Sequence, residues 1–201
     1  MIALVDYGLG NLRSVQKALQ AAGGEVLLTE SAEDILSADK VVLPGVGAFR
    51  DGMDGLQTRR LVEVLHLLAE RGRPLLGICL GMQLLFEGST EGGNYAGLGL
   101  LPGNVVRFQA EGLKVPHTGW NQIYPQAASP LLTGLEPGVY AYFNHGYYPQ
   151  AGDPPTVLAQ TEYGIQFASV VGWGSIYGVQ FHPEKSQSVG LSILRNFVER
   201  C

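Results

Sequence analysis

A cysteine lies between two glycines in the segment Gly77-Ile-Cys-Leu-Gly81, where an apolar run meets a helical pattern. A sharp turn from strand to helix strains its middle residue, and flanking glycines leave room for it, as in the G-x-S-x-G elbow of hydrolases. Here the nucleophile would be the thiol of Cys79. A helix N-terminus after it lowers the pKa of a thiol and offers backbone N–H groups to an oxyanion. Taken alone, the segment favours a buried structural cysteine.

A second candidate follows a strand pattern near the C-terminus, in Gly178-Val-Gln-Phe-His-Pro-Glu-Lys-Ser186. Proline between His182 and Glu184 holds the chain extended, so both side chains could reach one side of a loop. A lone His-x-Glu is more often a surface pair, but an imidazole oriented by a carboxylate is also a general base. Together the two segments predict a triad: Cys79 attacks, His182 moves the proton and Glu184 fixes the imidazole tautomer.

A glycine-rich turn, Pro44-Gly-Val-Gly-Ala-Phe49, follows a short apolar run. Glycines on both sides of Val46 let its peptide turn, so that its N–H could face an anion. A plain turn fits these residues equally well. Beside a thiol nucleophile, we predict that the N–H groups of Val46 and Leu80 hold a tetrahedral oxyanion, an interaction worth about 3–4 kcal/mol per donor.

Strand and helix patterns alternate over the first ninety residues and must position these groups. The predicted strands are Ile2–Val5, Val26–Leu28, Lys40–Leu43 and Leu75–Ile78. The predicted helices are one capped by Asn11 and ended by Gly23-Gly24, one over Gln57–Arg71 and one from Leu80 to Phe86. This alternation predicts an α/β fold with an open, mostly parallel sheet and helices on both faces. Ligands bind at the carboxyl ends of such strands.

Short β-type runs replace this alternation from Gly92 onward and predict added antiparallel or mixed strands, within a single domain over residues 1–201. These runs are Val105–Phe108, Val139–Phe143, Val157–Gln160, Gln166–Val171 and Ser175–Val179. The segment Val115–Asn121 is expected to be irregular. A last helix is predicted over Ser188–Arg200, with Leu191, Leu194 and Val198 on its buried face.

Composition narrows the functional classes. The 201 residues are 46% hydrophobic and carry a net charge of −5 without a basic run, so no nucleic-acid groove is expected. The two cysteines, far apart, favour a reducing cytoplasm over a disulfide framework. The first residues do not resemble a signal peptide, and no apolar stretch is long enough to span a membrane. Four scattered histidines give no metal-ligand spacing, and no cofactor is predicted.

The remaining polar candidates have plainer interpretations. Gly8-x-Gly10 hints at a dinucleotide fingerprint, but Arg13 occupies the third glycine position. His66 lies on the polar face of its predicted helix and is expected to be solvated. The sequence favours a structural role for His117, whereas the role of His145, at a strand end, stays open.

Two motifs about a hundred residues apart, Gly77-Ile-Cys-Leu-Gly-Met-Gln83 and Phe181-His-Pro-Glu184, resemble the class I (triad) glutamine amidotransferases. Further motifs make the chain similar to the glutaminase subunits of imidazole glycerol phosphate synthase. They are Asp6-Tyr-Gly-x-Gly-Asn11, Pro44-Gly-Val-Gly-Ala-Phe49, Pro116-His-x-Gly-Trp-Asn121 and His182-Pro-Glu-Lys-Ser186. The resemblance covers nearly the whole chain and implies a flavodoxin-like sheet.

The resemblance implies that glutamine is hydrolysed to glutamate and ammonia. The ammonia would pass to a separate (β/α)₈-barrel cyclase, the partner in a heterodimer, for synthesis of imidazole glycerol phosphate and aminoimidazole carboxamide ribotide in histidine biosynthesis. Positions that match glutamine contacts are Gly45, Gly47, Gln83, Glu91, His145, Gly146 and Tyr147. Positions that match the cyclase interface are Asn11, Trp120, Asn121, Tyr142 and Lys185. The family usually has Ser or Thr where this chain has Gly146, so only a backbone contact is expected there.

A glutaminase that worked alone would waste glutamine, which suggests a gate. In this hypothesis, the N–H of Val46 points away from the site until the cyclase docks. Three other functions remain open: the glutaminase of a different synthase, a thiol hydrolase or chaperone-like protein on the same fold, and a scaffold without activity.

Overall fold

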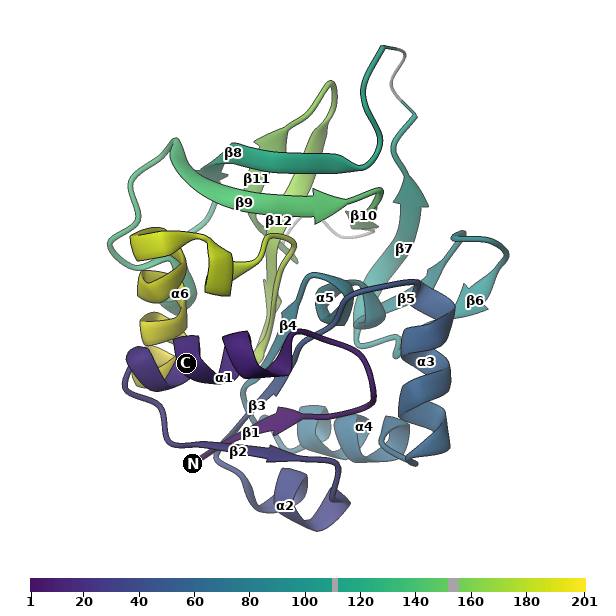
Figure 1. Cartoon of the computed structure of the whole chain (residues 1–201), viewed down its shortest axis with the longest axis vertical. Helices are drawn as coiled ribbons and strands as arrows, with labels where there is room; N and C mark the ends of the chain where they lie inside the picture. Colours follow the sequence, from purple (N-terminus) through teal and green to yellow (C-terminus); the bar gives the residue numbers. More distant parts are fainter. Residues whose placement is uncertain (110–111, 152–155) are drawn as a thin grey trace.

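The computed structural model describes residues 1–109, 112–151 and 156–201. Its main sheet has nine strands in the order β2-β1-β3-β4-β13-β12-β11-β8-β9 (Figure 1). Their bounds are β1 Ile2–Val5, β2 Val26–Thr29, β3 Lys40–Leu43, β4 Leu75–Ile78, β8 His117–Pro125, β9 Val139–His145, β11 Val157–Glu162, β12 Gln166–Trp173 and β13 Ile176–Val179. The first five strands in this order, β2, β1, β3, β4 and β13, are parallel to one another. The remaining four, β12, β11, β8 and β9, extend the sheet by antiparallel pairs. This confirms the predicted sheet with antiparallel additions.

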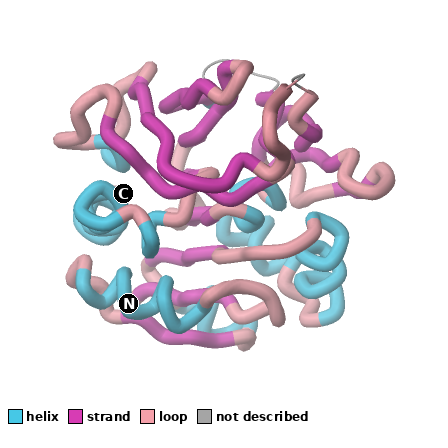
Figure 2. The backbone as a smooth tube through the Cα atoms, turned by 45° about the horizontal axis from the view of Figure 1, so that its top comes forward, coloured by secondary structure: helices cyan, strands magenta, loops and turns pink. Residues whose placement is uncertain are grey.

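Helices cover both faces of the parallel strands (Figure 2). One face packs α1 (Leu12–Ala21) and α6 (Gln187–Arg200). The other packs α2 (Ala32–Ser37), α3 (Phe49–Thr58), α4 (Val62–Glu70) and α5 (Leu80–Leu84). Within β1, Ile2 and Leu4 join the first core, whereas Ala3 and Val5 join the second. A strand buried on both faces needs such a continuous apolar run, which is why β1, β3 and β4 were readable from the sequence.

A smaller sheet, in the order β10-β7-β5-β6, stands beside the carboxyl ends of the parallel strands (Figure 1). Its strands are β5 Phe86–Ser89, β6 Tyr95–Ala96, β7 Leu101–Arg107 and β10 Tyr147–Ala151. The chain leaves β9 of the main sheet at His145 and enters β10 of the small sheet at Tyr147. Gly146 therefore lies where the two sheets meet. Short 3-10 helices in the described parts of the chain include η1 (Pro130–Leu132) and η3 (Pro183–Lys185).

The single helix predicted over Gln57–Arg71 is wrong. Helix α3 already begins at Phe49 and ends at Thr58, and α4 starts at Val62 after Arg60, whose φ of 56° interrupts the helical path. Glycines in α3 weaken its helical signal, because glycine is a poor helix former. One of them is required by packing: a Cβ on Gly55 would lie 2.5 Å from the carbonyl oxygen of Tyr7.

Two further expectations for local structure are wrong. The helix predicted to reach Phe86 ends at Leu84, because Phe86 begins β5 and pairs with Leu101 of β7. The segment Val115–Asn121 was expected to be irregular, but from His117 onward it forms β8 in register with β9. Both errors arise because pairing with distant strands decides these conformations.

The ends of two helices also differ from expectation. Asn11 immediately precedes α1, but its side chain makes no capping hydrogen bond. In α6 the fully buried apolar residues are Ile193, Leu194 and Phe197, and of the three expected ones only Leu194 is among them. Contacts with η1 and α1 decide which side of α6 faces the core. The spacing of apolar residues in the sequence does not reveal these contacts.

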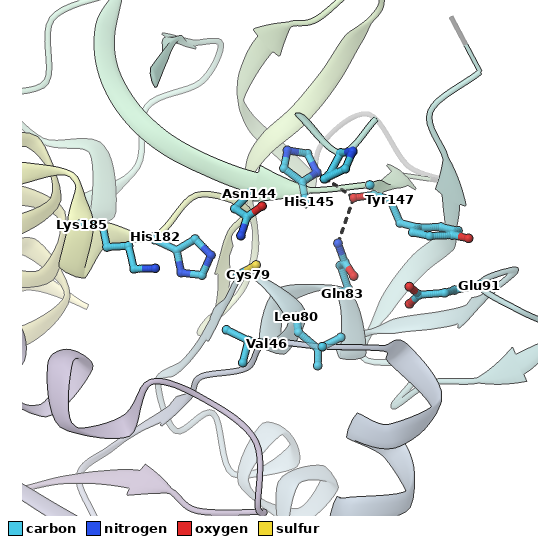
Figure 3. A pocket seen from close by; sticks show the side chains of 13 residues that line it. Val46, Cys79, Leu80, Gln83, Glu91, Asn144, His145, Tyr147, His182 and Lys185 are labelled. Carbon is cyan, nitrogen blue, oxygen red and sulfur yellow. Dashed lines mark hydrogen bonds between the residues drawn. The ribbon is translucent and has the colours of Figure 1, made fainter. Parts of the chain in front are cut away.

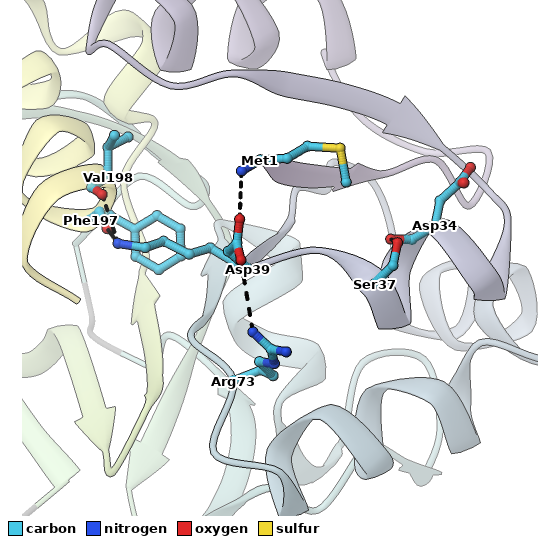
Figure 4. A network of polar contacts seen from close by, with 8 residues as sticks. Met1, Asp34, Ser37, Asp39, Arg73, Phe197 and Val198 are labelled. Atoms are coloured by element: carbon cyan, nitrogen blue, oxygen red, sulfur yellow. Dashed lines mark hydrogen bonds and ion pairs between the residues drawn. The ribbon is translucent and has the colours of Figure 1, made fainter.

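Polar contacts fix α6 and the first strand to the start of β3 (Figure 4). Lys40 Nζ donates to the carbonyl oxygens of Phe197 and Val198 at 2.9 and 2.7 Å, which supplies partners to unsatisfied carbonyls at the helix C-terminus. Asp39 accepts a hydrogen bond from the N-terminal amine of Met1 at 2.7 Å. In the described parts of the chain, no helix combines the length and apolar character needed to cross a membrane.

Candidate active site

The elbow at Cys79 has the strained geometry that the sequence predicts. Cys79 has φ 55° and ψ −110°, a conformation that costs a non-glycine residue about 1–3 kcal/mol. A Cβ on Gly77 would lie 2.6 Å from the carbonyl oxygen of Gly81. A Cβ on Gly81 would lie 1.8 Å from the carbonyl oxygen of Leu43. Both glycines are therefore needed for close approach of the backbone, and the predicted elbow is confirmed.

Topology brings the separate motifs to one edge of the sheet. Strand β4 pairs in parallel with β3 on one side and β13 on the other. Cys79 follows β4, the turn Pro44–Ala48 follows β3, and the His182 segment follows β13. Carboxyl ends of neighbouring parallel strands meet at the same edge, so chain segments over a hundred residues apart surround one thiol. We call Pro44–Ala48 the oxyanion turn below.

His182 and Glu184 form a buried pair. His182 Nδ1 lies 3.0 Å from Glu184 Oε1, and the two side chains are 4% and 1% exposed. A carboxylate only accepts, so Nδ1 carries a proton and Nε2 is left for the cysteine. The other carboxylate oxygen of Glu184, Oε2, is buried without a partner among the described residues. The extended backbone predicted around Pro183 is wrong: Pro183 begins the 3-10 helix η3, and this turn brings the Glu184 carboxylate to the imidazole.

Electrostatics favour a charged imidazole at this position. Burial lowers the pKa of His182, but hydrogen bonds to the Cys79 sulfur and to Glu184, together with their negative charges, raise it to about 10. The pair of acceptors thus outweighs the desolvation of the ring. A protonated imidazole beside a thiol stabilises the thiolate, which is the reactive form of cysteine.

A cavity of about 190 Å³ opens between the two sheets in front of the thiol (Figure 3). Its lining residues are Val46, Gly47, Cys79, Leu80, Gln83, Glu91, Pro116, Asn144, His145, Gly146, Tyr147, His182 and Lys185. The predicted substrate contacts are all among them except Gly45, which is buried behind the cavity against Tyr7 and the elbow. Cys79 and His182 point toward one another in this view.

Two predicted oxyanion donors lie at the cavity. Leu80 is the first residue of α5, so its N–H has no acceptor within the helix. Val46 is 40% exposed, and its N–H has no hydrogen-bond acceptor among the described residues. The turn that carries it is flanked by Gly47, whose φ is 102°. Neither N–H group thus has a hydrogen-bond acceptor among the described residues.

Amide side chains connect the elbow with the opposite wall. Gln83 Nε2 donates to the carbonyl oxygen of Tyr147 and to Gln180 Oε1, each at 3.0 Å. Gln180 Nε2 in turn lies 3.9 Å from Cys79 Sγ. The wall formed by β10 is thus hydrogen-bonded to the helix that carries the nucleophile.

Behind the cavity, two buried histidines form a hydrogen-bonded chain. His145 Nδ1 donates to the carbonyl oxygen of Tyr147 at 2.7 Å, which leaves Nε2 to accept from His117 Nδ1 at 3.1 Å. His117 Nε2 then accepts from the Asn121 amide at 3.2 Å. Burial lowers the pKa of His117 to about 4 and that of His145 to about 3, so both rings are neutral. The structural role favoured for His117 fits this network, and His145 shares it while also lining the cavity.

Of the predicted interface residues, Trp120 and Asn121 lie on β8, Tyr142 on β9 and Lys185 on η3, whereas Asn11 precedes α1. Trp120 is 47% exposed and packs edge-to-face on Tyr142, with ring centroids 6.1 Å apart. Lys185 Nζ lies 5.7 Å above the Tyr142 ring, beside the cavity mouth. The Asn121 amide points to the other face, where it also donates to the carbonyl oxygen of Glu162 at 2.8 Å. The exposed Trp120 and Lys185 and the half-buried Tyr142 together form a patch, which we call the aromatic patch.

Several residues at the site were missed from the sequence. Asn144 and Pro116 line the cavity, Gln180 approaches the thiol, and Tyr7 donates to the carbonyl oxygen of Pro44 at 2.6 Å. Tyr7, Pro116 and Gln180 lay within motifs or segments that the sequence singles out, but their side chains gave no separate signal. Within the described ranges, no group of three or more His, Cys, Asp or Glu side chains could hold a metal ion.

Comparison with known proteins supplies independent information. The family model described as glutamine amidotransferase class-I matches residues 3–201. Among curated proteins, "Imidazole glycerol phosphate synthase subunit HisH" of Moorella thermoacetica is 52% identical over 198 residues, covering 98% of this chain and 94% of that protein. The protein of the same name from Bacillus subtilis is 50% identical over 204 residues, covering 99% and 96%.

Solved structures share the fold at low sequence identity. One described as "Crystal structure of glutamine amidotransferase" has a TM-score of 0.77 at 20% identity and covers 98% of this chain and 97% of its own. A glutamine amidotransferase from Thermotoga maritima has a TM-score of 0.69 at 15% identity and covers 99% and 96%. At this identity, the likeness concerns the fold alone.

Proposed function

Because the chain belongs to the class-I glutamine amidotransferase family, we propose that Cys79, His182 and Glu184 hydrolyse the side-chain amide of glutamine. One observation carries this proposal: a buried imidazole lies between a carboxylate and a strained cysteine at the edge of a cavity. The thiol that the sequence alone left as a structural candidate thus has the base and the space that a nucleophile needs.

The reaction follows from the roles of these atoms. The Cys79 sulfur attacks the amide carbon while its proton resides on His182, and the carbonyl electrons move to oxygen. The N–H groups of Leu80 and Val46 bind the resulting oxyanion. His182 then protonates the nitrogen, the C–N bond breaks, and ammonia leaves a glutamyl thioester. Water, deprotonated by His182, attacks the thioester and releases glutamate and the free thiol.

Substrate binding is proposed along the cavity wall. The carboxylate of Glu91 suits the substrate ammonium group, and the backbone of His145, Gly146 and Tyr147 suits its remaining polar atoms. Gln83 is bonded to the same wall at the Tyr147 carbonyl, so it also orients these contacts. Gly47 leaves space beside the turn, whereas Gly45 supports the site from behind.

The chain is the glutaminase subunit of imidazole glycerol phosphate synthase and supplies ammonia for histidine biosynthesis. Relatives of that name, about half identical over nearly the full length, support this function. We propose a heterodimer with a (β/α)₈-barrel cyclase, which receives the ammonia and its nucleotide substrate. Two free thiols, Cys79 and Cys201, suit the reducing cytoplasm that we propose as the compartment.

The aromatic patch is the proposed docking surface for the cyclase, and Asn11, which precedes α1, is proposed as a further contact. Exposed tryptophan and tyrosine are enriched in binding hot spots, where truncation costs about 2 kcal/mol or more. The Asn121 amide is already engaged inside the protein, so we expect less from it. Trp120→Ala should weaken cyclase binding about thirtyfold by calorimetry. Trp173→Ala, at a position 56% exposed on β12, is the matched control; equal affinities for the two variants would contradict this surface.

The oxyanion turn is the proposed gate. In the free subunit, the Val46 N–H would point away from the thiol, and cyclase docking would turn it inward. The exposed Val46 and the positive φ of Gly47 support a peptide that can turn. A free subunit that hydrolyses glutamine as fast as the complex with cyclase and nucleotide would refute the gate.

The glutaminase assay that tests the proposal compares wild type with Cys79→Ala, each with and without the cyclase and its nucleotide. We expect glutamate release from the wild-type complex and none above background from Cys79→Ala. Cys201→Ala, which removes the other thiol, is the control and should retain full activity. Release of glutamate by Cys79→Ala would exclude the proposed nucleophile.

A further inference from the structure

A buried phenol fixes one end of the oxyanion turn. The Tyr7 hydroxyl donates to the carbonyl oxygen of Pro44 at 2.6 Å. Tyr7 is 1% exposed and does not line the cavity, so it is not placed to touch substrate. Burial, and to a lesser extent the nearby Cys79, raise the pKa of this phenol, which therefore keeps the proton that it donates.

The same hydroxyl lies against the turn and the elbow. A Cβ on Gly45 would be 2.3 Å from the Tyr7 oxygen and 2.9 Å from Leu80 Cβ. The phenol oxygen, Gly45 and the first residue of α5 are therefore in close contact. The first half of the oxyanion turn cannot shift toward Leu80 without moving this hydroxyl.

The other end of the turn has its own anchor. Glu91 Oε2 accepts the backbone N–H of Phe49 at 2.8 Å. Between the anchors, Val46 and Gly47 are exposed, and their N–H groups have no hydrogen-bond acceptor among the described residues. The turn is thus held at Pro44 and Phe49 and unsupported in the middle, where the proposed oxyanion donor lies.

We propose that Tyr7 is a positioning residue for the glutaminase reaction: by holding the Pro44 carbonyl, its hydroxyl sets the place of the Val46 N–H relative to Cys79. This inference rests on the proposed function. An oxyanion donor must lie about 2.7–3.1 Å from the developing charge, and a misplacement of about 1 Å costs on the order of 100-fold in rate. The effect appears in kcat, because the oxyanion forms only after glutamine is bound.

Tyr7→Phe tests this inference, since it removes one oxygen and keeps the buried ring. Glutamine hydrolysis is measured in the complex with cyclase and nucleotide. We expect kcat to fall about tenfold, less than the complete loss of a donor, while KM stays within about twofold. The matched control is Tyr163→Phe, whose hydroxyl donates to the carbonyl oxygen of Lys114 at 2.7 Å, outside the cavity lining. It should leave kcat unchanged.

Alkylation of Cys79 by iodoacetamide is the second readout, because this reaction forms no oxyanion. Its rate should be the same in Tyr7→Phe and wild type, and urea denaturation verifies that the variant is folded. A wild-type kcat in folded Tyr7→Phe would overturn the inference, and so would an equal loss of alkylation, which would place the effect on the thiol. An inactive wild-type complex would instead overturn the proposed function itself.

Discussion

The charge on Glu184 should account for a large part of the catalytic rate. In the structure, this carboxylate accepts the hydrogen bond of His182 Nδ1 at 3.0 Å, in a setting where both side chains are almost fully buried. Glu184→Gln keeps the size of the side chain and one carbonyl oxygen but removes the charge. The substitution therefore separates the electrostatic contribution of the residue from its packing.

The magnitude follows from the burial of the pair. A hydrogen bond to a charged group contributes about 1.5–3 kcal/mol, and a site closed to water belongs to the upper part of that range. Without this charge, His182 holds the proton of Cys79 less readily, so a cost of about 2–3 kcal/mol falls on forming the reactive thiolate–imidazolium pair and lowers kcat by roughly 30- to 150-fold. KM should change little, because Glu184 does not line the cavity.

The assay measures glutamate release by the complex with cyclase and nucleotide. Glu136→Gln, on an exposed residue, is the matched control and should have wild-type kinetics. Affinity for the cyclase, measured in parallel, shows that each variant is folded. If Glu184→Gln retains kcat within threefold of wild type, then the carboxylate neither charges nor orients the base, and the triad is wrong.

Three further predictions concern the histidines and Gly146. The His182 ring should titrate near pH 10 by NMR, and Cys79→Ala and Glu184→Gln should each lower this pKa; a wild-type pKa near 6.5 would contradict the ion pair. Because the folded pKa is raised, the pair stabilises the fold fully below about pH 6.5, and this contribution is lost as the pH rises through about 10. His117 and His145 have lowered pKa values of about 4 and about 3 in the folded protein. Their contribution to the free energy of unfolding is therefore fully present above about pH 6.5, and it is lost as the pH falls from there through about 4 and about 3. Urea denaturation between pH 7 and pH 4 should show a slope of up to about 2.7 kcal/mol per pH unit for the two protons, whereas a flat profile would refute buried neutral rings. Gly146→Ser should fold normally, because a Cβ there meets Val115 Cγ1 at 3.4 Å, and should lower KM for glutamine through an added hydroxyl contact; a raised KM would show that the backbone contact is all the site can use.

The elbow and the imidazole–carboxylate pair could be predicted because their signals are local. Glycines two residues from Cys79 and a proline between His182 and Glu184 constrain the backbone whatever surrounds them. The inner parallel strands β1, β3 and β4 were equally readable, since each is an apolar run buried on both faces. Adjacent parallel strands then bring the two motifs together without any long-range information from side chains.

What the sequence could not predict depends on distant pairing. His117 and His145 meet only because β8 and β9 pair in a register that sets these residues opposite one another. Helix α3 contains Gly52 and Gly55, so its propensity is weak, and its packing on the elbow helix and the end of β1 decides its conformation. The Tyr7 hydroxyl finds its acceptor 37 residues away, and nothing in the spacing of the two residues indicates that contact.

A glutamine-like diazo ketone tests the central claim most directly, because it alkylates only a thiol that is activated beside a glutamine pocket. Mass spectrometry of the treated complex should show one adduct per chain, on Cys79, and excess glutamine should prevent it. Cys201 is the internal control, since it is a free thiol outside the cavity. An unlabelled Cys79, or labelling of both thiols to the same extent, would contradict a glutaminase centre at this elbow.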